Sequence, residues 1–304
     1  IKMNIFTVLT MIGGLALFLY GMHILGEGLA KLSGGKLESF LSKMTDTPLK
    51  GVLLGAGTTA VIQSSSATTV MVVGFVNSGI MQLKQAVGII MGANIGTTIT
   101  SWILSLSGIE SDSVFVMLLK PEAFSPILAI VGVFFLMFSK SEQKREAGGI
   151  LLGFAILMFG MDTMSNAVEP LKNVPAFTRL FVAFSNPFIG ILTGTILTAV
   201  IQSSSASIGI LQALCATGTV PFSAALPIIM GQNIGTCITA LLSSVGANTN
   251  AKRAAFIHLY FNVIGTTIFT GAFYLVHAFI PFAFLNQIAT PAGIAIIHSC
   301  FNVA

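Results

Sequence analysis

Charged side chains are scarce in this chain. Asp, Glu, Lys and Arg make up 8% of its 304 residues, whereas 54% are apolar. Soluble domains carry about a quarter charged residues, so this composition excludes an ordinary water-soluble domain and fits a membrane. Cysteine is also rare. Cys215, Cys237 and Cys300 have no paired spacing, which favours structural thiols over a disulfide framework.

Long apolar segments alternate with short polar ones. About 20 helical residues cross the roughly 30 Å hydrocarbon core of a bilayer. The segments long enough are residues 5–25, 85–106, 121–139, 147–165, 222–246 and 253–280. The first is not a cleavable signal peptide, because many hydrophobic segments follow and no small-residue cleavage pattern closes it. We therefore expect an all-α, polytopic helical protein of the cell (cytoplasmic) membrane, surrounded by the lipid bilayer.

The few basic residues cluster at the ends of these apolar segments. The clusters are Lys31, Lys36, Lys43 and Lys50, then Lys140, Lys144 and Arg145, then Lys252 and Arg253. The net charge is +4, but dispersed clusters at segment ends fit lipid headgroups better than nucleic acid. We expect no nucleic-acid partner. The charge bias is too small to orient the protein, and the sequence leaves its oligomeric state open, a homodimer included.

The chain repeats itself at a constant offset of 139 residues. Gln63 corresponds to Gln202 and Asn94 to Asn233, without a gap. The strongest matches are TAVIQSSSA, at 59–67 and 198–206, and IIMGxNIGTxIT, at 89–100 and 228–239. A shared apolar character would spread matches over Leu, Ile and Val, whereas here glycine and polar positions match. The chain therefore contains an internal duplication.

The duplication predicts the organisation of the membrane domain. Secondary transporters are often built from two inverted-topology repeats, with the substrate site at their interface near the bilayer midplane. We assign residues 1–139 to the first repeat and 140–280 to the second. Residues 281–304 are expected to begin a further transmembrane helix, in a chain that looks truncated. A local echo links the segment from Ile257 to Val263 with that from Ile297 to Val303.

Each copy of the QSSS motif interrupts an apolar segment. Residues 51–62 form an apolar run too short to span a membrane, and the apolar pattern resumes at residue 67. This pattern is typical of a discontinuous helix or re-entrant hairpin, whose broken tip is tolerated where it lines a cavity. Gly51 and Gly55, like Gly190 and Gly194, have the spacing that lets two such half-helices approach closely.

The motif offers ligands for an anion and for a hard cation. Serine hydroxyls and the free amides of a helix N-terminus donate hydrogen bonds to anions. Hydroxyl and carboxamide oxygens suit Na⁺. No Lys or Arg occurs between Lys50 and Lys84 or between Arg179 and Lys252. Because an unpaired anion is costly to desolvate, we expect the anion to bind together with cations, which couples the two species.

The paired QSSS motifs, each followed by a GxNIGT block, resemble those of the type II sodium-dependent phosphate cotransporter family, over roughly residues 5–280. The resemblance implies sodium-coupled uptake of inorganic phosphate by alternating access. It implies that the phosphate ligands are Gln63, Ser64, Ser65, Ser66, Gln202, Ser203, Ser204 and Ser205. It implies that the Na⁺ ligands are Gln63, Ser66, Asn94, Thr97, Gln202, Ser205, Asn233, Thr236 and Asn262.

The chain departs from the better-known animal members in one element. They carry a His-x-x-Phe-Asn element after both repeats, whereas residues 121–138 have none.

The roles of two ionisable residues stay open. His23 and Asp162 occupy one repeat position within apolar segments, and are either functional or near helix ends at the membrane interface.

Two rival functions share some of these features. An intramembrane serine hydrolase is disfavoured because whole serine triplets are duplicated with no acid or base beside them. An anion channel or exchanger on the same fold is the second rival.

Overall fold

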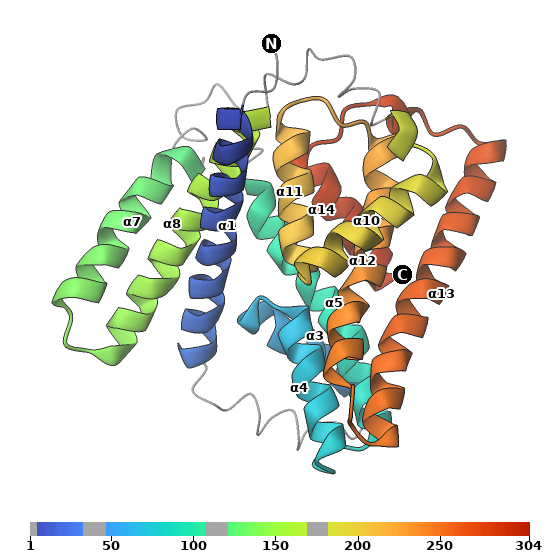
Figure 1. The fold of residues 1–304 in the computed structure, drawn as a ribbon, viewed down its shortest axis with the longest axis horizontal. Helices are drawn as coiled ribbons and strands as arrows, with labels where there is room; N and C mark the ends of the chain where they lie inside the picture. The colour runs from blue at the N-terminus through green and yellow to red at the C-terminus, as the bar shows by residue number, and fades with distance from the viewer. Residues whose placement is uncertain (1–4, 33–46, 107–120, 169–181) are drawn as a thin grey trace.

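The computed structural model describes residues 5–32, 47–106, 121–168 and 182–304, and these residues are helical, with no strand among them (Figure 1). The predicted all-α class is confirmed. The α-helices are α1 (Ile5–Leu32), α3 (Pro48–Ile62), α4 (Ser65–Asn77), α5 (Leu83–Ser105), α7 (Pro121–Phe138), α8 (Glu142–Val168), α10 (Pro187–Ile201), α11 (Ser204–Ala216), α12 (Phe222–Ser243), α13 (Thr249–Phe279) and α14 (Pro291–Val303). A short 3-10 helix covers Ala283–Asn286.

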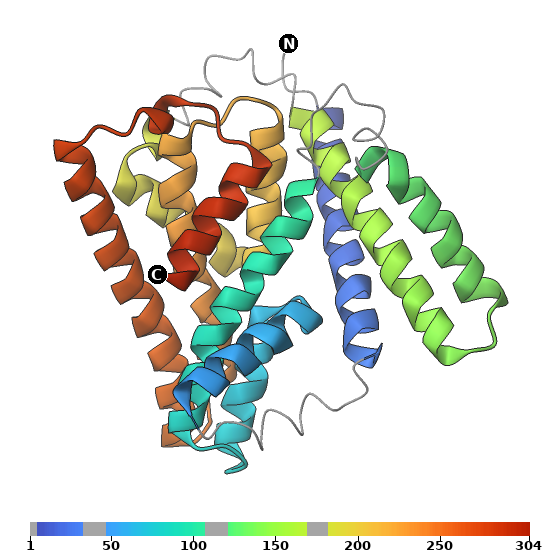
Figure 2. The ribbon, with the colours of Figure 1, turned by 180° about the vertical axis from the view of Figure 1, so that it is seen from behind.

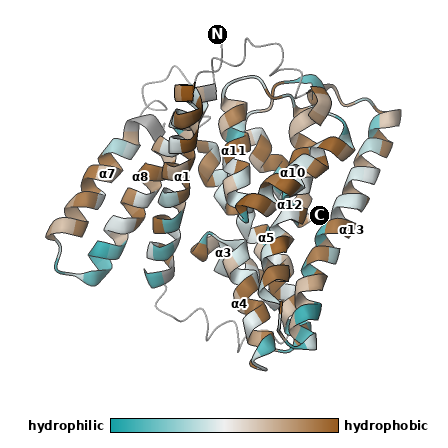
Figure 3. Ribbon diagram, in the orientation of Figure 1, coloured by the Kyte–Doolittle hydropathy of each residue, from teal (hydrophilic) through white to brown (hydrophobic). Residues whose placement is uncertain are grey.

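The chain is a multi-pass membrane protein. Within the described ranges, five helices, α1, α5, α8, α12 and α13, are long and apolar enough to cross a bilayer. The predicted span 121–139 forms α7, whose apolar part, Phe124–Phe138, is shorter. Hydrophilic residues gather at the lower ends of α1, α8 and α13, where they would meet headgroups and water (Figure 3). Lys36 and Lys43 of the first basic cluster lie outside the described residues.

The duplicated sequence folds into duplicated elements. α3, α4 and α5 recur as α10, α11 and α12, and the matching helices begin at corresponding residues, such as Pro48 and Pro187. The α3–α4 pair lies in the lower half of the molecule and the α10–α11 pair in the upper half (Figure 1). The inverted relation of the repeats and the domain boundaries at 139 and 280 stay predictions.

Glycines bring the first helix of each pair into backbone contact with a long helix. A Cβ at Gly55 of α3 would lie 2.1 Å from the carbonyl oxygen of Ile89 in α5. In the second repeat, a Cβ at Gly194 of α10 would lie 2.0 Å from the carbonyl oxygen of Ile228 in α12. The small-residue spacing therefore serves contact with α5 and α12, rather than the expected contact between two half-helices.

A second glycine contact joins the repeats through α1 and α8. A Cβ at Gly21 would lie 2.3 Å from the amide nitrogen of Leu157, and one at Gly160 would lie 2.4 Å from that of Phe18. Phe18 is fully buried, and its ring fills the space beside Gly209 of α11. The α1–α8 pair thus contacts the second helix pair directly.

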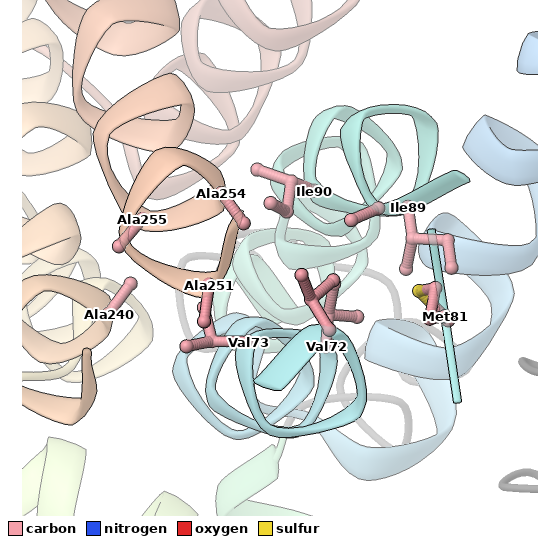
Figure 4. Close-up of a cluster of buried hydrophobic side chains, with 11 residues drawn as sticks. Val72, Val73, Met81, Ile89, Ile90, Ala240, Ala251, Ala254 and Ala255 are labelled. Atoms are coloured by element: carbon pink, nitrogen blue, oxygen red, sulfur yellow. The ribbon is translucent and has the colours of Figure 1, made fainter. Parts of the chain in front are cut away.

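Helix α13 (Thr249–Phe279) is the last helix of the range assigned to the second repeat, but it packs on both repeats. Its residues Ala251, Ala254 and Ala255 share a buried cluster with Val72 of α4 and Ile90 of α5 (Figure 4). Small alanine side chains let the α13 backbone come close to these helices.

Helix α14 lies beside α5 of the first repeat (Figure 2). There the indole Nε1 of Trp102 donates a 3.0 Å hydrogen bond to the Ser299 hydroxyl. Helices α13 and α14 therefore connect both halves.

The backbone contacts generate a stability prediction. Gly231→Ala should lower the free energy of unfolding by about 3 kcal/mol, because its Cβ would lie 1.9 Å from the Ile191 carbonyl oxygen and force α10 away from α12. A thiol-reactive dye in detergent measures unfolding through the buried Cys215 and Cys237, after Cys300→Ser removes the exposed thiol.

Gly57→Ala is the matched control for this prediction. Nothing lies within 4 Å of its Cβ position, so unfolding should be unchanged or shifted to higher temperature. Equal unfolding temperatures for the two variants would contradict the close packing.

Candidate functional site

The first QSSS motif forms the break between α3 and α4. Gln63 ends α3 in the left-handed region, with φ 58° and ψ 25°, which is uncommon for a residue with a side chain. Ser64 is extended, and its hydroxyl caps α4 by accepting a 3.1 Å hydrogen bond from the Ala67 amide. The Thr59 hydroxyl donates to that of Thr68 at 3.0 Å, which joins the two arms.

The second motif has the same geometry. Gln202 ends α10 with φ 59° and ψ 22°. The Ser203 hydroxyl accepts from the Ala206 amide at 3.2 Å and caps α11. Thr198 donates to Ser207 at 2.9 Å across the two arms. The predicted helix break thus occurs in both copies and makes each motif the tip of a helical hairpin.

The two hairpin tips meet. The Ser66 hydroxyl donates a 3.2 Å hydrogen bond to the backbone carbonyl of Gln202, across 136 residues of sequence. Ser65 and Ser204, the first residues of α4 and α11, are both buried. The positive N-terminal ends of two helices therefore lie close to a shared set of hydroxyls, an arrangement suited to an anion.

The hairpins carry almost no formal charge. Apart from Lys50 at the start of α3, the four hairpin helices contain no Lys, Arg, Asp or Glu. The described part of the chain also holds no group of three or more His, Cys, Asp and Glu residues placed to bind a metal ion. The polar atoms at the tips are neutral hydroxyl, carboxamide and backbone groups, which suit an alkali cation better than a transition metal.

The two tips differ in how their glutamines are held. Gln63 is 5% exposed, and its Oε1 accepts a 2.9 Å hydrogen bond from the Thr100 hydroxyl of α5. Gln202 is exposed, and the corresponding hydroxyl, that of Thr239 in α12, is buried without a hydrogen-bond partner among the described residues. The structure therefore breaks the symmetry of the repeat at the site.

The GxNIGT blocks lie inside continuous helices. Glycines permit both unusual backbone and close approach, and α5 and α12 run through the blocks without a break. Gly92 and Gly231 therefore serve the close approach of α3 and α10. Thr97 and Thr236 donate to carbonyl groups one turn earlier in their own helices, at 3.1 Å and 2.9 Å.

Each block asparagine pairs with an asparagine from a later helix. Asn94 donates to Oδ1 of Asn262 in α13 at 2.9 Å, and Asn233 donates to Oδ1 of Asn302 in α14 at 3.0 Å. The His-x-x-Phe-Asn element that is missing after the first repeat is thus supplied to it by α13. The corresponding element of α14 serves the second repeat.

Three residues at the site were missed by the sequence prediction. Asn302 could have been found from the echo between residues 257–263 and 297–303, and Thr100 and Thr239 from their place at the end of the matched IIMGxNIGTxIT blocks. His23 and Asp162, in contrast, are exposed on α1 and α8. His23 lies 3.5 Å from the Glu27 carboxylate on the same helix. Neither forms part of the hairpin tips.

Comparison of the sequence with known proteins identifies its family. The sequence profile of the Na⁺/Pi-cotransporter family matches residues 17–166 and 156–287. The chain belongs to the Na⁺/Pi-cotransporter family, and is a phosphate-transport protein rather than an enzyme. This finding excludes the serine hydrolase.

Individual relatives include two proteins that are named for phosphate transport or export. The uncharacterized protein YqeW of Bacillus subtilis (strain 168) is 34% identical over 83% of this chain and 78% of its own length. The putative inorganic phosphate export protein YjbB of Escherichia coli (strain K12) is 27% identical over 86% of this chain, which spans 46% of that relative. The rat sodium-dependent phosphate transport protein 2A is 36% identical over 32% of this chain and 15% of its own length. No solved structure is significantly similar to the chain.

Proposed function

We propose that the protein is a sodium-coupled secondary transporter that imports inorganic phosphate, and that Na⁺ and phosphate bind together between the two QSSS tips. The observation that carries the proposal is the contact between Ser66 and Gln202, which brings two helix N-termini and two serine triplets to one uncharged site. The family and the name of the rat relative support phosphate as substrate and Na⁺ as coupling ion.

Electrostatics explains why the two species would be coupled. Phosphate carries one or two negative charges at neutral pH, and the hairpins offer it hydroxyl and amide donors but no fixed cation beyond Lys50. Leaving such an anion unpaired in a low-dielectric site is strongly unfavourable. Bound Na⁺ supplies the missing charge, so each ligand raises the affinity for the other. The proposed Na⁺ ligands are oxygens of Gln63, Ser66, Asn94 and Thr97, with their repeat mates.

The first prediction about transport concerns the coupling ion. In proteoliposomes, an inward Na⁺ gradient should drive labelled phosphate above its equilibrium concentration, whereas an equal K⁺ gradient should not. Phosphate flux that is equal with and without Na⁺ would contradict the proposal. That outcome would support the second candidate, a sodium-independent pathway; the name of the Escherichia coli relative favours phosphate export as its direction.

The second prediction concerns the serines that begin α4 and α11. Ser65→Ala and Ser204→Ala should each raise the half-saturating phosphate concentration about tenfold, because a hydrogen bond to a charged ligand contributes about 1.5–3 kcal/mol. Ser78→Ala is the matched control, since Ser78 follows the other end of α4 and is exposed. Unchanged kinetics in both site variants would remove the motif from the phosphate site.

The asymmetry of the tips supports an alternating-access mechanism. In the observed state Thr100 bonds Gln63, while the buried hydroxyl of Thr239 has no partner in the described part of the chain. Ala67, at the first tip, is exposed, whereas its mate Ala206 is fully buried. Exchange of the two environments would give a second state in which Thr239 bonds Gln202 and Ala206 becomes accessible. Because the two bonds are chemically equivalent, such states can be close in free energy.

The third prediction tests this exchange with engineered thiols in a Cys300→Ser background. Thr100→Val should shift the population towards the second state by about fivefold, since one hydrogen bond contributes about 1 kcal/mol. Labelling by a water-soluble thiol reagent should therefore rise at Ala206→Cys and fall at Ala67→Cys.

Thr239→Val is the matched variant for this prediction. It removes the unpaired hydroxyl of the observed state and the expected bond of the second, so labelling should change in the opposite direction. Identical effects of the two valine substitutions would contradict the exchange.

A further inference from the structure

Two asparagine pairs occupy equivalent places in the two repeats. Asn94 and Asn233 belong to the long helices α5 and α12, and their partners Asn262 and Asn302 belong to α13 and α14. Each partner lies four residues after a fully buried histidine, His258 or His298. The arrangement recurs although the 139-residue offset that relates Asn94 to Asn233 does not relate Asn262 to Asn302, which indicates a requirement of the site.

The hydrogen bonds define the orientation of every carboxamide. The Nδ2 of Asn262 donates to the His258 backbone carbonyl at 2.9 Å, and the Nδ2 of Asn302 donates to the His298 carbonyl at 2.8 Å. A backbone carbonyl can only accept, so the amide nitrogen of each partner must face it. Its Oδ1 then faces the block asparagine, which must present its own Nδ2.

This orientation leaves one oxygen free in each pair. The polar atoms of Asn262 and Asn302 all take part in hydrogen bonds, whereas Oδ1 of Asn94 and of Asn233 has no hydrogen bond among the described residues. A carboxamide oxygen is a ligand suited to a hard cation such as Na⁺. Without its partner, each block asparagine could rotate and present its amide nitrogen instead.

We propose that Asn302 and Asn262 are positioning residues that hold Asn233 and Asn94 with their carbonyl oxygens directed to cations. The proposal rests on the proposed sodium coupling, and gives Asn262 a different role from the predicted one, which was direct ligation. It also gives α13 and α14 a function: each helix holds the proposed cation ligand of one repeat, Asn94 or Asn233, in place. Groups that orient a metal ligand commonly change metal affinity by 10–100-fold when removed.

A purely structural role of the asparagine pairs predicts a different effect on stability. Asparagine pairs between membrane helices also stabilise helix association. Loss of Asn302 would then lower stability by the same amount at every sodium concentration. A positioning role instead requires a change in the sodium dependence itself, and that change must act through Asn233.

Sodium-dependent thermal stabilisation of the purified protein separates the two roles, with choline chloride holding ionic strength constant. Asn302→Ala should raise the half-stabilising Na⁺ concentration about tenfold. Ser299→Ala, on the same helix, removes the hydrogen bond to Trp102 but not the asparagine pair, and should leave the sodium dependence unchanged. In proteoliposomes at saturating Na⁺, Asn302→Ala should keep the half-saturating phosphate concentration within about twofold.

A double variant tests whether Asn302 acts through Asn233. If it does, Asn233→Ala with Asn302→Ala should need no more Na⁺ than Asn233→Ala alone. Additive effects would overturn the positioning role and make Asn302 an independent ligand. An unchanged half-stabilising Na⁺ concentration in Asn302→Ala would overturn it as well, while sodium-driven transport by the unmodified protein left the proposed function intact. No sodium effect on the unmodified protein would overturn both.

Discussion

The left-handed turn at Gln63 and Gln202 is the constraint on which the rest of the site depends. It ends an apolar helix after four turns and starts another, which exposes helix N-terminal amides at the tip of each hairpin. A residue with a side chain in this conformation costs of order 1–3 kcal/mol unless the surroundings enforce it. They do so in both copies. The Thr59–Thr68 bond and its mate join the hairpin arms, and the serine caps satisfy the next helix.

The glycine contacts explain how such a turn is held in place. Backbone contact between α3 and α5, and between α10 and α12, seats each broken helix against a continuous one. Membrane helices cannot rely on the hydrophobic effect to associate, so close packing of small residues provides much of the attraction. Helix α5 then brings the Thr100 hydroxyl to Gln63 at the first broken tip. Packing and ligand chemistry are therefore supplied by the same pair of helices.

In the proposed mechanism, the near absence of charge at the site couples phosphate binding to Na⁺ binding. Fixed arginines or lysines would bind an anion by themselves and release it reluctantly. Neutral donors with mobile cations make anion binding conditional on the cations. The broken symmetry between Gln63 and Gln202 adds a second requirement, because two equivalent hydrogen bonds are available and, within the described ranges, only the one to Gln63 is formed. The lack of charge at the site and the presence of two equivalent hydrogen-bonding positions both follow from the duplication of one uncharged motif.

Several features of the protein could be predicted from the sequence because they depend on local pattern. The lack of charge and the long apolar segments indicated membrane helices. The apolar runs interrupted at Gln63 and Gln202 indicated broken helices, and the constant offset indicated that the two breaks are equivalent. The sequence did not indicate that α5 and α12 continue through the GxNIGT blocks. Glycine in a helix is compatible with either a break or a close contact, and only the neighbouring helix distinguishes the two.

Tertiary structure alone decided which residues meet. The partner of Asn233 is Asn302, which the duplication could not identify because α14 lies beyond residue 280, and the partner of Asn94 comes from α13, in the range assigned to the other repeat. The contact between Ser66 and Gln202, and the loss of symmetry at the tips, are likewise products of packing. A repeat in sequence specifies equivalent local conformations, because each depends on nearby residues. The pairing of distant side chains depends on how whole helices cross, and on which of two equivalent states the molecule occupies.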